Sequence, residues 1–184
     1  MLKFLRKKTV LFSSLIAMLI MFVVAILIVN RGIDGGDGSS ILGLQLAFDK
    51  QLGIEIIERW GPEGRAFYNS WAFTDYIYAA CYSLFFASLL AMLSSRDGKP
   101  DSRWDLIPPL IALSAGAMDC IENAMEYVFV QNPVDFSADL FFFHSIITVC
   151  KWAAIMTAVL IAFVLALRQL VHASAPTPKK RIFP

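Results

Sequence analysis

Four apolar runs dominate this sequence, and each is long enough to cross a lipid bilayer. They cover residues 9–29, 67–93, 106–130 and 140–167, and a membrane-spanning helix needs about 20 residues. Hydrophobic residues make up 58% of the chain and charged residues 17%, whereas roughly a quarter of a typical soluble domain is charged. Little of the chain remains for a soluble domain. The sequence therefore predicts an all-α fold, a polytopic membrane four-helix bundle that forms one domain over residues 1–184.

The first run follows a basic N-terminus, "MLKFLRKK", as a cleaved signal peptide would. A signal peptide, however, has an apolar core of about 7–15 residues and a cleavage site with small residues. This run is longer and ends in "ILIVNRG". We therefore interpret it as a retained transmembrane helix.

The distribution of basic residues predicts the orientation. They gather before the first span, between the second and third, and after the fourth: Lys3, Arg6, Lys7, Lys8, Arg96, Lys99, Arg103, Arg168, Lys179, Lys180 and Arg181. The opposite side carries none in "QNPVDFSAD" and few in the longer segment 30–66. Because short cytoplasmic loops are enriched in Lys and Arg, both termini are expected to be cytoplasmic. The tail 172–184 is expected to be attracted to anionic lipid headgroups.

The extracytoplasmic segment 30–66 is predicted to hold an extra helix between the first two spans. Ser40 is a candidate N-cap for a helix over Ile41–Trp60. Gly61 is expected to end this helix, and Pro62 suits the first turn of the next. The extra helix either packs on the outer ends of the bundle or forms a lid over a cavity.

The third span carries an unusual density of polar residues in "AGAMDCIENAMEYVF". With a rise of about 1.5 Å per residue, Glu126 lies about 6 Å below the outer surface and Asp119 about 16 Å. The same estimate for the fourth span places His144 about 4–5 Å down and Lys151 about 15 Å down. These depths pair Asp119 with Lys151 and Glu126 with His144, and they place Asp75 of the second span level with Glu122.

The polar residues of each span also keep to one helical face, because their spacing is three, four or seven residues. An ionised side chain facing lipid costs several kcal/mol, so these faces are expected to converge inside the bundle. The candidate polar cluster comprises Arg65, Tyr68, Asp75, Tyr78, Asp119, Glu122, Asn123, Glu126, His144 and Lys151.

Two interpretations of this cluster remain open. Buried charges can fix helix packing without any chemistry, which would make the chain a structural or accessory subunit. However, at least four acids face one lysine and one histidine. This surplus indicates protonated carboxyls, a bound cation or a water-accessible cavity. We therefore favour a polar cavity in the outer half of the bilayer that binds a small amphipathic or lipid-like ligand.

Sharper functions are alternatives within that view. An enzyme acting on a lipid or sterol-like substrate would use His144 or Glu122 as acid or base. A metal site from Asp119, Glu122, Glu126 and His144 lacks a strong spacing signature, so no metal and no cofactor is predicted. Ion transport is disfavoured, since the inner halves of the last two spans are almost devoid of polar residues. Nothing in the sequence indicates nucleic-acid binding, and the three cysteines form no C-x-x-C pair.

Partners are expected to be membrane lipids, a lipid-like or small-molecule ligand, and either a second copy of the chain or another membrane protein. Ala112, Ala115, Gly116 and Ala117 permit a close approach of helices. They do not say which helix approaches.

The order "GPEGRAFY", then Asp75, then "DCIEN", then "KW" resembles a pattern in small bacterial membrane proteins with four helices and no assigned activity. The resemblance spans residues 61–152. It implies a bacterial cytoplasmic membrane protein whose polar centre is formed by Arg65, Asp75, Asp119, Glu122, Asn123 and Lys151. Sterol isomerases and sigma-2-receptor-like proteins are similar in architecture, as small helical bundles with intramembrane acids, but no residues can be matched.

Overall fold

The computed structural model describes residues 1–32, 40–95 and 102–174, with side chains for 1–27, 40–95 and 102–171. The described part is mostly helical and contains no strand. Its helices are α1 (Leu2–Leu5), α2 (Lys8–Gly32), α3 (Ile41–Gln45), α4 (Lys50–Leu93), η1 (Arg103–Leu106), α5 (Ile107–Gln131) and α6 (Ala138–Ser174). Four of them, α2, α4, α5 and α6, are long and apolar enough to cross a membrane. The all-α class is therefore confirmed. The predicted tail 172–184 and most of the connector after α2 lie outside the part with described side chains.

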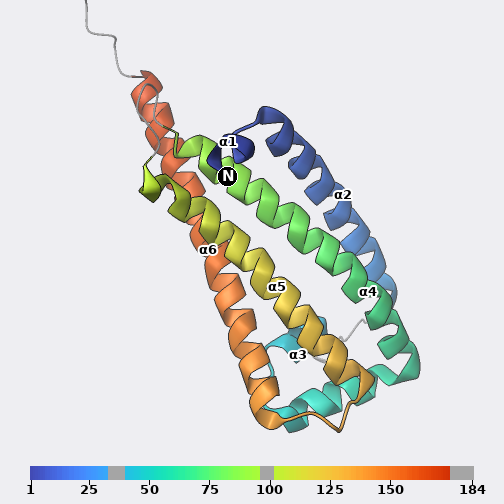
Figure 1. Cartoon of the computed structure of the whole chain (residues 1–184). Helices are drawn as coiled ribbons and strands as arrows, with labels where there is room; N and C mark the ends of the chain where they lie inside the picture. The colour runs from blue at the N-terminus through green and yellow to red at the C-terminus, as the bar shows by residue number, and fades with distance from the viewer. Residues whose placement is uncertain (33–39, 96–101, 175–184) are drawn as a thin grey trace, which may run out of the picture.

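The four long helices do not form a closed bundle. Helices α4, α5 and α6 pack against one another, whereas α2 packs chiefly against α4. In Figure 1, α2 lies along α4 on the side away from α6. A closed bundle would also seat α2 against α5 or α6. The structure is instead a three-helix core with a fourth helix on one flank.

The segment 41–60 is not the single helix that the sequence predicts. Ser40 caps α3 as expected, since its Oγ accepts a hydrogen bond from the Gly43 amide at 3.0 Å. The helix ends at Gln45, and beyond it Phe48 has a φ of 56°, which a bulky residue rarely adopts. The Phe48 amide donates to Ser145 Oγ on α6 at 3.2 Å, and Asp49 caps α4. The break between α3 and α4 therefore lies where the chain contacts α6.

Helix α4 has two parts, which meet at a kink. Gly61 has φ 64° and ψ −174°, a region that is essentially restricted to glycine, and Pro62 begins the next turn. The predicted boundary at Gly61 is therefore present as a kink. Before it, residues 50–60 run across the end of the core; beyond it, α4 runs alongside α5 (Figure 1).

Residues 41–60, called the end cap below, close one end of the core with apolar side chains. Ile56, Ile57 and Trp60 pack with Phe129 of α5 and Phe141 of α6 in one buried cluster. Phe141 and Phe129 are fully buried, and their ring centroids are 5.2 Å apart. The end cap therefore shields the helix ends nearest to the polar cluster.

The opposite end of the core holds α1 and the C-terminal part of α6 (Figure 1). Leu2 and Leu5 are buried there against Leu90 and Ala91 of α4. Arg6 Nε donates a hydrogen bond to the Ala91 carbonyl at 2.9 Å. A capping box formed by Ser102 and Asp105 begins the 3₁₀ turn η1 that leads into α5. Helix α1 and the C-terminal end of α6 thus lie at the same end of the core.

Helices α4 and α5 approach each other closely at Gly116. A Cβ atom at this position would lie 2.6 Å from the Cβ and Oγ of Ser83 and 3.0 Å from the Ala79 carbonyl oxygen. Ala112 and Ala115 are buried on the same face, whereas Ala117 is exposed. The small residues of α5 therefore serve an interface within the chain.

Candidate functional site

The centre of the polar cluster is the ammonium group of Lys151, which α6 projects between two acids of α5. Lys151 Nζ donates to Asp119 Oδ1 at 3.0 Å and forms an ion pair with Glu122 Oε2 at 2.7 Å. All three side chains are almost completely buried. Asp119 and Glu122 can share one lysine because a spacing of three residues places them on the same helical face. The predicted contact between Asp119 and Lys151 is therefore present.

Glu126 forms a second part of the cluster, one helical turn closer to the end cap. Its Oε1 lies 3.1 Å from His144 Nε2, and its Oε2 accepts a hydrogen bond from the Tyr68 hydroxyl of α4. The side chains of Glu126, His144 and Tyr68 are fully buried. The predicted contact between Glu126 and His144 is also present. Tyr68 joins them from the third helix of the core and stacks on Trp60 of the end cap.

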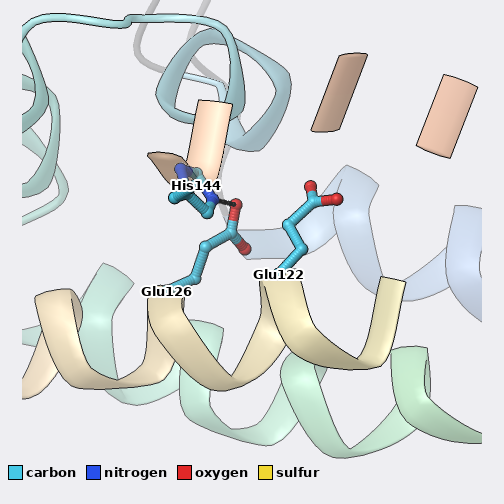
Figure 2. Close-up of side chains that lie close together, drawn as sticks. All are labelled: Glu122, Glu126 and His144. Carbon is cyan, nitrogen blue, oxygen red and sulfur yellow. Dashed lines mark hydrogen bonds and ion pairs between the residues drawn. The ribbon is translucent and has the colours of Figure 1, made fainter. Parts of the chain in front are cut away.

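Figure 2 shows how the carboxylates are presented. Glu122 and Glu126 rise from successive turns of α5 on the same side, and His144 meets Glu126 from the opposite helix. Glu122 Oε1 has no hydrogen-bond partner among the described residues, and neither does His144 Nδ1. Both side chains have an exposed fraction of 0%. These two atoms are therefore buried polar groups whose capacity for hydrogen bonding is unused.

Two further contacts connect α4 to the polar face of α5. Tyr82 donates its hydroxyl hydrogen to Asp119 Oδ2 at 2.9 Å. Asn123 donates to Asp75 Oδ2 at 2.9 Å. Each carboxylate oxygen of Asp119 thus accepts a hydrogen bond. Asp75, by contrast, accepts one from the neutral amide of Asn123. Asp75 is also less buried than the acids of α5.

A cavity of about 440 Å³ lies beside this cluster. Asp75, Asp119 and Lys151 provide its charged atoms, and Ser40 together with Gln45 of the end cap adds neutral polar groups. Its apolar and aromatic walls come from α2, α3, α4 and α6: Met18, Ile41, Leu42, Trp71, Tyr78, Tyr82, Phe86, Trp152 and Ile155. The cavity thus lies where α2 and α6 both face α4. Trp152 and Leu42 are 45% and 49% exposed, so its rim reaches the surface of the protein.

The predicted site residues divide into three groups. Asp75, Tyr78, Asp119 and Lys151 line the cavity. Tyr68, Glu122, Asn123, Glu126 and His144 are buried in the hydrogen-bonded network and do not line it. Arg65 is half-buried on α4, and no hydrogen bond or ion pair joins it to the described cluster. Glu122 contacts Lys151 and is not among the residues that line this cavity.

Tyr82, Trp71 and Trp152 are important parts of the site that were not selected from the sequence. Tyr82 and Trp71 do share the polar stripe of α4 with Asp75, at spacings of seven and four residues. This shared stripe is the sequence signal that indicates Tyr82 and Trp71 as site residues. Trp152 follows Lys151 directly, and the Lys151 Nζ atom lies 5.6 Å from the centroid of its ring.

No family model, no curated protein and no solved structure matches this chain. The site is therefore interpreted from its own geometry.

Proposed function

We propose that this chain is a membrane protein that binds a small amphipathic ligand in the cavity between α2, α4 and α6, and that a cationic group of the ligand pairs with Asp75. The observation that carries the proposal is the charge of the cavity wall. Lys151 is already shared by Asp119 and Glu122. The carboxylate of Asp75 faces the same cavity with a neutral amide as its hydrogen-bond donor.

The other walls suit such a ligand. A volume of about 440 Å³ falls within the ~300–1,000 Å³ that is usual for small-molecule sites. Trp71, Tyr78 and Tyr82 surround Asp75 on α4, and aromatic rings attract cations through their π faces. An apolar chain would contact Met18, Phe86 and Ile155. A protonated amine attached to an apolar body therefore matches the cavity in both charge and polarity.

The cavity also supports ligand binding over a purely structural role. Buried charges that only fix helix packing require a filled interior, and here a cavity adjoins the charged cluster. Catalysis by His144 or Glu122 on a ligand in the cavity is not favoured, because neither residue lines it. We place the cavity in the outer half of the bilayer and both termini in the cytoplasm, as the basic residues predict.

The test compares three single-chain probes of equal length, dodecylamine, dodecanol and dodecanoate, added to the purified full chain in detergent. Thermal unfolding of the wild type is expected to shift upward with the amine and little with the alcohol or the acid. Asp75→Asn should abolish the amine-specific shift. Glu63→Gln is the matched control, since Glu63 is an exposed acid on the same helix, and it should keep the shift.

Equal shifts with all three probes would overturn the proposal, because they would reflect only the apolar chain. Retention of the amine-specific shift by Asp75→Asn would overturn the assignment to Asp75. The structural alternative predicts no probe-specific shift in any variant.

A further inference from the structure

Glu122, Glu126 and His144 form a compact set of metal-ligand atoms behind the cavity. One ligand atom from each residue lies within 4.8 Å of the other two. The two glutamates come from adjacent turns of α5, and the histidine comes from the facing turn of α6 (Figure 2). All three side chains are 0% exposed. The set therefore joins two helices at a position closed to bulk solvent.

The charges at this position favour a cation. Four acids, Asp75, Asp119, Glu122 and Glu126, are connected to the cluster, and Lys151 is the ammonium group that contacts two of them. Buried carboxylates without compensation are costly. Glu122 Oε1 adds an independent observation, because this buried oxygen has no hydrogen-bond partner in the described structure. It is a free ligand atom next to Glu126 and His144.

We propose that Glu122, Glu126 and His144 bind one divalent metal ion of the zinc class. Imidazole nitrogen and carboxylate oxygen are ligands that zinc accepts, at about 2.0–2.2 Å. Such bonds separate neighbouring ligand atoms of a tetrahedral site by about 3.3 Å. The 3.1 Å distance between Glu126 Oε1 and His144 Nε2 is close to that spacing. Two carboxylates and one divalent cation are also neutral together.

The surroundings of the three ligands suit this role. Tyr68 donates to the second oxygen of Glu126, the type of outer contact that orients a ligating carboxylate. Lys151 contacts Glu122 through Oε2 and has a second partner in Asp119. The ammonium group can therefore remain with Asp119 when a metal takes Glu122. Lys151 would then separate the metal from the cavity.

The experiment uses the full chain in detergent, stripped with a chelator and titrated with Co²⁺, which replaces Zn²⁺ and absorbs visible light when bound at a tetrahedral site. One Co²⁺ per chain is expected, with displacement by Zn²⁺. Glu122→Gln and His144→Ala should each weaken Co²⁺ binding at least ten-fold. Asp139→Asn and Glu63→Gln change exposed acids and should bind as the wild type does.

Lys151→Met separates a metal site from a set of structural contacts. This variant removes the competing cation from Glu122, so Co²⁺ should bind at least as tightly as in the wild type. Added Co²⁺ should also raise the melting temperature of the variant. Where His144→Ala fails to fold, X-ray absorption of the wild type decides, with one imidazole nitrogen expected among the ligands.

A folded wild type that shows no stoichiometric Co²⁺ spectrum overturns the proposal. So does unchanged binding in folded Glu122→Gln and His144→Ala. These results do not depend on the amine-binding test, since Asp75 is not among the three ligands.

Discussion

The hydroxyl of Tyr82 on α4 donates to Oδ2 of Asp119 on α5 at 2.9 Å, while the other oxygen of Asp119 accepts from Lys151 on α6. One carboxylate thus connects all three helices of the core. Because Asp119 also lines the cavity, the same contacts that hold the helices together shape the proposed binding site.

Replacement of Tyr82 by phenylalanine tests how much the hydrogen bond to Asp119 contributes to stability. It leaves a buried oxygen of Asp119 without its donor, which costs about 1–3 kcal/mol, and the ring itself is retained. A lower melting temperature in detergent is expected. Tyr127→Phe is the control, because Tyr127 is 48% exposed on α5, and it should melt as the wild type does. Equal effects of the two substitutions would show that the Tyr82 hydroxyl contributes nothing specific.

Lys151→Met, in metal-free protein, should be among the most destabilising single changes in the core. It leaves Asp119 and Glu122 buried without their shared cation, and breaking a buried ion pair on one side costs about 3–5 kcal/mol. Asp119→Asn in the same chain removes one of the stranded charges and should recover part of the loss. Melting temperatures of the two single variants and the double variant measure this coupling. Additive losses would contradict the ion pair.

Gly116→Val should loosen the contact between α4 and α5. Its side chain would meet Ser83 at a distance that real Cβ atoms do not tolerate, and overpacking of this kind costs about 1–3 kcal/mol. Ala117→Val, one residue further on the exposed side, is the matched control and should be tolerated. Unfolding of both variants by denaturant in detergent compares them, and equal stability would argue against the close approach.

The orientation can be tested with single cysteines in a chain whose Cys81, Cys120 and Cys150 are replaced by serine. Asp135→Cys lies in the exposed turn between α5 and α6, and Arg103→Cys lies at the opposite end of the core. A membrane-impermeant thiol reagent added outside intact cells should label position 135 and leave position 103 unlabelled until the membrane is permeabilised. The reverse pattern would invert the topology.

The depth of polar residues along each span was enough to predict the two main contacts of the cluster. Asp119 with Lys151 and Glu126 with His144 follow from the rise of an α-helix alone. Depth does not describe rotation about the helix axis, however. Depth alone therefore places Glu122 level with Asp75. In the structure, Asp75 is hydrogen-bonded to Asn123, and Glu122 forms an ion pair with Lys151.

The division of segment 41–60 could not be predicted for a different reason. Nothing in "LQLAFDKQLG" is a strong helix breaker before its final glycine. At the break, Phe48 donates a hydrogen bond to Ser145, which lies 97 residues further along the chain and cannot be paired with it from sequence. The position of α2 on the flank of α4 could not be predicted from the sequence either. An apolar span has no polar stripe to indicate which neighbour it faces.

That flanking position of α2 divides the protein into parts that can vary separately. Among the described residues, the polar network is built by α4, α5 and α6, whereas α2 contributes Met18 to the cavity wall. Substitutions on α2 can therefore enlarge or narrow the cavity while every charged contact stays in place. The size of the accepted ligand and the recognition of its charge are thus separable properties, and related chains could diverge in the first while keeping the second.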